Sequence, residues 1–230
     1  MEMERPDRVA DDPWWRFGLV TVGPLFRAGI RLRVVGVDRI PPAGPAILAA
    51  NHVSPLDPIA VALAAARRGR TIRYLTASEA YDIPVIGWGL RKFRQIPIRR
   101  GARDAAAVED AARVIRNGAL AGIFPEGRLG PGDALQTAKS GMARLALASG
   151  APVVPLGVWG MQRRWSREGI RWTEPPLRPI GVLVIGTRIE PKGAPSDVAA
   201  VRSLTDRVMS EIAALVERAK AVAGDRASQS

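Results

Sequence analysis

The sequence predicts an α/β fold: a single domain in which a mixed, largely buried sheet is flanked by helices, with an amphipathic helical segment at the amino terminus. From Leu32 onward, short β-like runs alternate with longer helical ones, which is the pattern of an α/β domain. The 230 residues suit one large domain with a sizeable core. Hydrophobic residues make up 47% and charged residues 24% of the chain, a composition typical of globular proteins.

The first half of the domain contains four expected strands and two expected helices. The strands lie at 32–37, 46–50, 71–76 and 94–99, and the one at 46–50 is wholly apolar, as a buried strand would be. A helix is expected at 58–67, with Asp57 as its N-cap and Pro58 as its first residue. A short helix follows near 84–93.

The second half continues the alternation. The expected helix at 103–117 has apolar residues on one stripe, and a buried strand at 119–124 leads into the loop PEGRLGPGD and a helix at 137–148. Strands are expected at 152–158 and 180–186, joined by a Trp- and Arg-rich connection of undefined form. A helix at 197–221 would cover the sheet. The expected organisation is an amino-terminal segment (1–30), the domain (31–222) and a flexible tail (223–230).

The amino-acid composition limits the partners and the chemistry that the chain can have. The 34 basic and 22 acidic residues give a net charge of +12, which favours polyanionic partners such as nucleic acid, anionic lipid surfaces or phosphorylated substrates. The absence of cysteine excludes disulfides and thiolate chemistry, and a single histidine argues against a metal site with nitrogen and sulfur ligands. The basic stretch 88–103 has no acidic residue and is either a phosphate-binding wall or a solvated basic face.

The stretch AANHVSPLD (49–57) contains the only histidine, His52, five residues before Asp57. A neutral imidazole can take a proton from a hydroxyl when a carboxylate fixes its tautomer and stabilises the imidazolium. The expected turn between strand and helix would point Asp57 back at His52. The pair is therefore a candidate catalytic dyad, and the alternative is a helix N-cap beside a structural turn residue.

A second candidate segment, Phe124-Pro-Glu-Gly-Arg128, follows the expected strand at 119–124. In open α/β sheets, ligands bind at the carboxyl ends of strands. Arg128 could hold a phosphate through two hydrogen bonds, while Glu126 orients it or accepts from a hydroxyl. The alternative is a salt bridge within the loop.

Taken in order, four blocks resemble the 1-acylglycerol-3-phosphate acyltransferase family of glycerolipid synthesis. The resemblance covers roughly residues 30 to 190. The blocks are NHVSPLD (51–57), QIPIRR (95–100, with Arg100 as its arginine), FPEGR (124–128) and PVVPL (152–156). Pro97 stands where the family usually has an aromatic residue, and Arg99 where it often has an acidic or polar one. These departures bear on selectivity for the polar head of the substrate.

The resemblance implies transfer of a fatty acyl group from a thioester, on coenzyme A or acyl carrier protein, to a hydroxyl of a lysophosphatidic acid-like acceptor in phospholipid biosynthesis. His52 would deprotonate the hydroxyl and Asp57 would orient His52, without a covalent enzyme intermediate. Backbone N–H groups near the turn would hold the oxyanion. No metal or bound cofactor is implied. The implied substrate-binding residues are Asn51, Ser54, Arg99, Arg100, Glu126, Gly127, Arg128 and Pro155.

A lipid acceptor implies contact with an anionic membrane surface. The amino terminus mixes aromatic and aliphatic residues with arginines, including Arg31 and Arg33, which suggests a pair of interfacial helices. The apolar run 17–26 is too short to span a bilayer, and the acidic first twelve residues do not resemble a secretory signal. We therefore expect a peripheral, monotopic protein on the cytoplasmic face of the cell membrane. The alternative is a surface helix packed on the domain.

Other functions remain open at this stage. Within the same family, the acceptor could be another lysophospholipid, a glycolipid or an amino-acid lipid. A different class, suggested by the charge and six tryptophans, is a nucleic-acid-binding protein. That class is disfavoured because no nucleic-acid motif is present and the His52–Asp57 pair would be idle there, so nucleic acid is not an expected partner.

Overall fold

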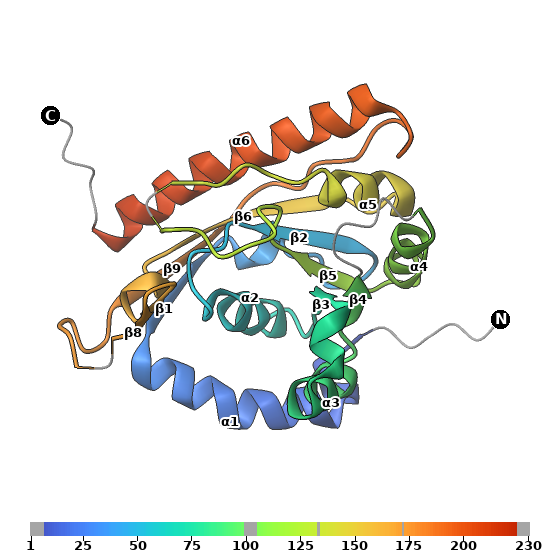
Figure 1. Cartoon of the computed structure of the whole chain (residues 1–230). Coiled ribbons are helices and arrows are strands. Elements are labelled where there is room, and N and C mark those ends of the chain that lie inside the picture. The colour runs from blue at the N-terminus through green and yellow to red at the C-terminus, as the bar shows by residue number, and fades with distance from the viewer. Residues whose placement is uncertain (1–6, 99–104, 133, 172, 225–230) are drawn as a thin grey trace, which may run out of the picture.

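The computed structural model describes residues 7–98, 105–132, 134–171 and 173–224. Seven strands form one sheet in the order β1-β9-β6-β2-β5-β3-β4 (Figure 1). Only β6 and β9 pair antiparallel within it, so the sheet is mixed, as predicted. Its strands are β1 (Arg31–Val35), β2 (Ala46–Ala50), β3 (Arg73–Ala77), β4 (Ile96–Ile98), β5 (Leu120–Ile123), β6 (Val153–Trp159) and β9 (Ile180–Ile185).

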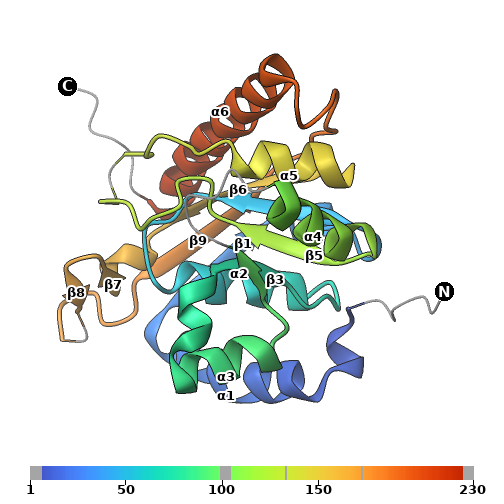
Figure 2. The same ribbon diagram turned by 45° about the vertical axis from the view of Figure 1, so that its right-hand side comes forward.

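Helices cover both faces of this sheet. On one face lies α2, with α1 outside it, and on the other lie α4, α5 and α6, while α3 packs beside α1 at the β4 end (Figures 1 and 2). Side chains of β2 alternate between two hydrophobic clusters, with Leu48 in the α1–α2 cluster and Ile47 in the α4–α5–α6 cluster. Every residue of β2 is buried for this reason. The helices are α1 (Pro13–Gly29), α2 (Asp57–Ala66), α3 (Pro84–Lys92), α4 (Ala105–Arg116), α5 (Gly141–Ser149) and α6 (Val198–Ala223).

In the described part of the amino-terminal segment, a short 3-10 helix (Val9–Asp11) precedes a single unbroken α-helix, α1, so the predicted pair of interfacial helices is wrong. Helix α1 is capped by Asp12, continues past Pro24 and ends where β1 begins, which places Arg31 and Arg33 in the sheet. Trp15 and Phe26 are buried in the same cluster as α2, so this segment is part of the domain core. Among the described helices, none combines the length and the apolarity that crossing a bilayer requires.

The Trp- and Arg-rich connection between β6 and β9 contains a short 3-10 helix (Met161–Arg163) and two short paired strands, β7 (Trp165–Ser166) and β8 (Gly169–Ile170). Buried Arg164 binds the carbonyl oxygens of Gly29, Arg171 and Leu177. Buried backbone polar groups need such partners. Arg164 thereby joins this connection to the end of α1.

Candidate active site

The two candidate segments lie side by side because their strands are neighbours. His52 follows β2, Phe124 follows β5, and these strands run parallel with Ala49 opposite Ile123. The carboxyl ends of parallel strands meet at one edge of a sheet, which is where ligands bind in open α/β folds. Residues more than seventy positions apart in the chain therefore share one site.

His52 and Asp57 form a hydrogen-bonded pair. The distance between His52 Nδ1 and Asp57 Oδ2 is 3.0 Å, and the same oxygen accepts the backbone N–H groups of Val53 and Ser54, each at 2.7 Å. Asp57 is thus the first residue of α2, and its carboxylate faces the preceding turn, so the prediction that it caps the helix is wrong. A carboxylate partner makes Nδ1 the donor and leaves the lone pair of the neutral imidazole on Nε2.

The environments of the two side chains differ. Asp57 is fully buried, whereas 20% of the His52 side chain is exposed. Burial raises the pKa of Asp57, and hydrogen bonds from His52 and the turn backbone oppose that rise. Asp57 Oδ1 has no hydrogen-bond partner among the described residues. Because burial shields the Asp57 carboxylate from water, its electrostatic interaction with the adjacent imidazole is strong.

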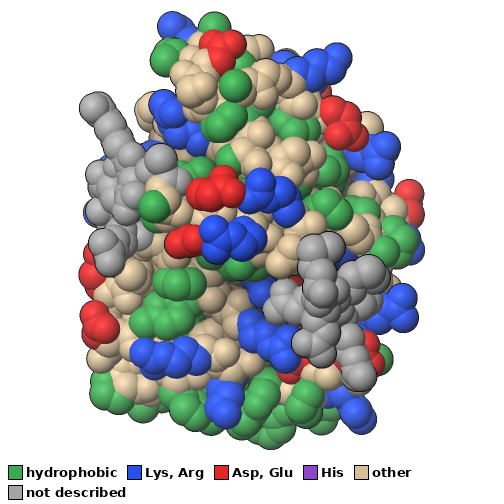
Figure 3. Space-filling view, turned by 90° about the vertical axis from the view of Figure 1, so that its right-hand side faces the viewer, with side chains coloured by type: hydrophobic (Ala, Val, Ile, Leu, Met, Phe, Trp, Pro, Cys, Tyr) green, Lys and Arg blue, Asp and Glu red, His purple; other side chains and the backbone are tan. Residues whose placement is uncertain are grey.

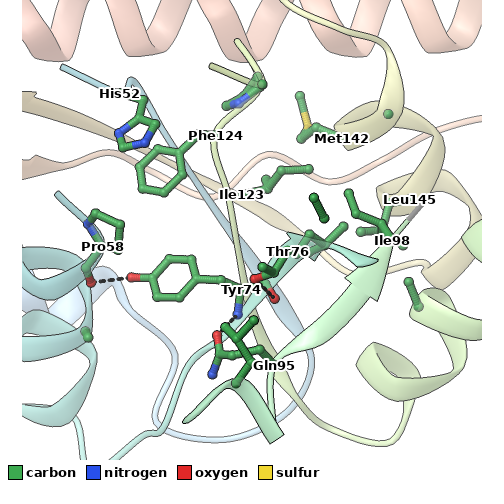
Figure 4. Close-up of a pocket in the computed structure, with 18 of the residues that line it drawn as sticks. His52, Pro58, Tyr74, Thr76, Gln95, Ile98, Ile123, Phe124, Met142 and Leu145 are labelled. Atoms are coloured by element: carbon green, nitrogen blue, oxygen red, sulfur yellow. Dashed lines mark hydrogen bonds between the residues drawn. The ribbon is translucent and has the colours of Figure 1, made fainter. Parts of the chain in front are cut away.

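Two aromatic rings support His52, and sequence reasoning missed both. Phe124 stacks on the imidazole at a centroid distance of 4.1 Å and 19°, and Tyr74 lies parallel to Phe124 at 6.0 Å (Figure 4). The Tyr74 hydroxyl donates to the Pro58 carbonyl at 2.6 Å, and burial raises its pKa well above its ordinary value, which keeps it a donor. Gly122 leaves room for Tyr74, because a Cβ there would lie 2.4 Å from its ring. The stack fixes the plane of the imidazole.

Glu126 joins the second segment to the first. One of its oxygens accepts the backbone N–H of His52 at 2.9 Å, and the other accepts that of Gln136 at 3.0 Å. Burial raises the pKa of this carboxyl, opposed by these two hydrogen bonds. Gly130 N–H also donates to the His52 carbonyl at 2.7 Å. Because both oxygens bind backbone and the side chain is only 2% exposed, Glu126 positions the loop and the histidine instead of pointing at a substrate.

A large apolar cavity of about 1380 Å³ opens beside His52. Pockets for drug-sized ligands typically have volumes of roughly 300–1,000 Å³, so this cavity can hold a larger molecule. Helices α1, α2 and α3 supply one part of its lining, and α4 and α5 supply another. Figure 4 shows His52, Phe124 and Tyr74 in this lining together with Ile123, Met142 and Leu145.

Polar groups reach the cavity from the FPEGR loop. Gly127 and Arg128 both line it, and Arg128 donates to the Gln136 side chain at 2.8 Å. Gly127 adopts φ +65°, a conformation that favours glycine. Lys139 and Arg144, which sequence reasoning did not select, also line the cavity. Arg99 and Arg100 lie outside the described residues.

Comparison with known proteins assigns the chain to a family. The model of the Acyltransferase family matches residues 31–159, a segment that contains His52, Asp57 and Glu126. The chain belongs to this acyltransferase family. A crystal structure of the 1-acyl-sn-glycerophosphate (LPA) acyltransferase from Thermotoga maritima is similar, with 26% identity, a TM-score of 0.69, and coverage of 86% of this chain and 76% of the other.

Several curated relatives carry specific names. The chain is 31% identical over 137 residues to a 1-acyl-sn-glycerol-3-phosphate acyltransferase of Borreliella burgdorferi, covering 59% of this chain and 54% of the relative. It is 29% identical over 166 residues to the lyso-ornithine lipid O-acyltransferase of Pseudomonas aeruginosa, covering 71% and 57%. The chain spans between 38% and 57% of the length of these curated relatives, and 38–45% of the mycobacterial ones.

Three predicted substrate-binding residues of this acyltransferase family member have other partners. The Asn51 side chain bridges β2 to β6 through the N–H and carbonyl of Val158, at 2.7 and 3.0 Å. Ser54 Oγ donates to the Trp165 carbonyl at 2.6 Å and accepts the Leu56 N–H at 3.1 Å. Pro155 is buried in β6 opposite Ala49. None of the three lines the cavity. Asn51 and Ser54 instead connect the histidine turn to β6 and to the segment after it.

The backbone N–H groups of the turn itself bind other groups of the protein. Its N–H groups at His52, Val53, Ser54 and Leu56 bind Glu126, Asp57 and the Ser54 hydroxyl. These four N–H groups are therefore not free to face an oxyanion, and donors elsewhere near the turn stay a prediction. Within the described residues, no cluster of three or more His, Asp or Glu side chains could hold a metal ion.

Proposed function

We propose that this chain transfers a fatty acyl group from an acyl thioester, carried on coenzyme A or acyl carrier protein, to the hydroxyl of a lysophosphatidic acid-like acceptor in phospholipid biosynthesis. The observation that carries the proposal is the His52–Asp57 pair beside a long apolar cavity that also contains Arg128. The family and the names of its relatives support the same reaction class.

In this reaction, His52 Nε2 accepts the proton of the acceptor hydroxyl as the oxygen attacks the thioester carbonyl. The C–O bond forms, the C–S bond breaks, and the leaving thiolate takes up the proton from the imidazolium. Asp57 holds Nδ1–H throughout and stabilises the imidazolium. The transfer is direct, because the chain has no cysteine and, in the described part of the chain, the only carboxylate or hydroxyl side chain that binds the imidazole is Asp57.

Arg128 is proposed to bind the acceptor's phosphate through two parallel hydrogen bonds. Replacing it by lysine substitutes a point charge for a planar fork, so Arg128→Lys is expected to raise the acceptor KM about tenfold, equivalent to one charge-assisted hydrogen bond. The thioester KM should stay unchanged. Steady-state titration of each substrate in turn measures both values.

The matched variant is Arg144→Lys, which changes another cavity arginine whose guanidinium donates to the Pro195 carbonyl. It should leave the acceptor KM unaltered. A rise in the thioester KM of Arg128→Lys, with an unaltered acceptor KM, would place Arg128 at the donor and reverse the assignment.

A second acceptor class deserves a direct assay, because one relative is named for lyso-ornithine lipid. Arg128 could pair with a carboxylate as well as with a phosphate. The test is thiol release by the purified protein with lysophosphatidic acid, lyso-ornithine lipid, another lysophospholipid and an acylated glycolipid, each with both thioester carriers. The largest kcat/KM for lysophosphatidic acid supports the proposal, and the largest value for another acceptor replaces it.

We also propose that the protein lies on the cytoplasmic face of the membrane as a peripheral protein. Apolar side chains on α1 and α3 are exposed to solvent: Phe17 is 60%, Leu25 73% and Val85 81% accessible. Along the lower edge of Figure 3, where α1 and α3 lie, hydrophobic side chains gather with basic ones between them. Trp14 of α1 and Trp88 of α3 meet edge to face at 5.1 Å. An apolar, aromatic and basic surface is typical of interfacial helices.

The double variant Phe17→Ser/Leu25→Ser is expected to weaken binding to anionic vesicles about tenfold to a hundredfold, because full burial of each side chain is worth roughly 1.5–3 kcal/mol and partial burial at an interface about half of that. Vesicle co-sedimentation measures the loss. Both residues are exposed, so the melting temperature should not change, and Val198→Ser, which alters an exposed residue of α6, is the control. Vesicle binding that is equal for the double variant and the wild type would exclude this surface.

A further inference from the structure

A second cavity, of about 560 Å³, lies where α1, β1 and the end of α2 meet, and five arginines line it. We call it the arginine pocket. Arg27 comes from α1, Arg31 and Arg33 from β1, Arg67 from the end of α2, and Arg178 from the segment before β9. Arg27, Arg31 and Arg33 are close in the chain, but only the fold brings Arg67 and Arg178 beside them.

The positive charge of the arginine pocket is not balanced by the residues around it. None of the residues that line it is acidic, and in the described part of the chain none of the five arginines forms an ion pair. Arg27 and Leu63 lie together beside Gly23, so the Arg27 guanidinium faces the pocket, and Arg178 donates to the Arg27 carbonyl. Arg33 instead donates to the Val222 carbonyl of α6, and Arg31 lies on the same face of β1 as Arg33, so the charge of the pocket comes from Arg27, Arg67 and Arg178. Clustered like charges repel one another, and an anion in the pocket would offset that repulsion.

The rest of the lining is apolar and connects the arginine pocket to the large cavity. Leu19 of α1 and Leu63 of α2 line both cavities, so the two adjoin at these side chains. Exposed Val22 and Leu25 lie on the same helix as Leu19 and Arg27. A ligand that fits the arginines and this apolar lining has an anionic head and an apolar chain.

We propose that the arginine pocket binds the phosphate group of an anionic phospholipid, with an acyl chain against Leu19 and Leu63. Arginine forks match phosphate oxygens, and guanidinium groups are weakly hydrated, which suits a site at the edge of a membrane. This site lies apart from Arg128 and gives the protein a discrete lipid position in addition to general charge attraction. The inference rests on the proposed function only for the membrane location.

The test is calorimetric titration with a water-soluble, short-chain phosphatidylglycerol below its micelle concentration, so that no membrane is needed. The wild type should bind it saturably, one molecule per chain, and bind short-chain phosphatidylcholine less tightly. Arg27→Gln/Arg67→Gln should weaken binding about tenfold through loss of charge-assisted hydrogen bonds. The matched pair Arg16→Gln/Arg207→Gln removes the same charge from exposed residues outside the pocket and should bind as the wild type does.

Three results would overturn the proposal. Equal weakening in the two double variants would mean diffuse charge attraction, and equal affinity for inorganic phosphate or coenzyme A would mean that the lipid chain makes no contact. A raised acceptor KM in Arg27→Gln/Arg67→Gln would assign the pocket to the substrate. Melting curves check that each variant is folded. Because the titration needs no turnover, phosphatidylglycerol binding by a protein that transfers no acyl group would refute the proposed function and leave the pocket standing.

Discussion

Replacing His52 by alanine is expected to lower kcat for acyl transfer about 10² to 10⁴-fold, the usual contribution of a general base. Without the imidazole, the acceptor hydroxyl has no proton acceptor at the end of β2, because Asp57 is fully buried beneath it. The KM values should change little, since the side chain takes the proton without holding either substrate. Thiol release by the purified variant at saturating substrates measures the effect.

The fold should tolerate this change. The His52 side chain is partly exposed, and the turn is held by hydrogen bonds from its backbone to Glu126 and Asp57, which alanine keeps. A melting temperature near that of the wild type is therefore expected, and His52→Gln, which preserves more of the contact with Phe124, should be as inactive as alanine. Near-normal turnover by either folded variant would show that His52 is not the base.

Asp57→Asn is expected to reduce kcat by a similar factor, about 10² to 10⁴, because a neutral amide cannot stabilise the imidazolium. Unlike the histidine variant, this one should also lose stability. An amide oxygen can take the place of Oδ2 and accept from the turn, but the NH₂ group then replaces Oδ1, which has no partner among the described residues. A buried unsatisfied donor costs about 1–3 kcal/mol.

Denaturant titration and activity per folded molecule separate the two losses. Asp38→Asn, at an exposed position, should change neither quantity and serves as the control. An Asp57→Asn protein that is less stable yet fully active per folded molecule would make Asp57 a structural residue and exclude the dyad.

The parts of the site that are local in the chain were predictable. His52 and Asp57 are five residues apart across one strand-to-helix turn, so their contact follows from the expected elements. The direction of the Asp57 carboxylate toward His52 was predicted and is confirmed. The backbone N–H groups that it binds were not predictable, because both the turn and the first turn of α2 offer such groups to it. The structure resolves this choice in favour of Val53 and Ser54.

The supports that join distant segments were out of reach of sequence patterns. The stack of Phe124 on His52 depends on β5 lying next to β2, and Tyr74 joins it because β3 lies on the other side of β5. The alternation of strands and helices along the chain does not determine the order of the strands in the sheet. Glu126 was expected to face a substrate because its loop lies at the carboxyl end of a strand, but its partners are backbone groups whose positions only the folded loop defines.

Helix α1 presents apolar side chains to the outside and, through Trp15 and Leu19, also lines the large cavity. A lipid that reaches His52 past this helix would never have to dissolve in water. The effective concentration of this lipid would then be its number of molecules per area of bilayer. Other lipids would lower that concentration by dilution, even when the total amount of substrate in the sample is constant. For such a protein, encounter is a two-dimensional search, and the composition of the surface acts as the substrate concentration.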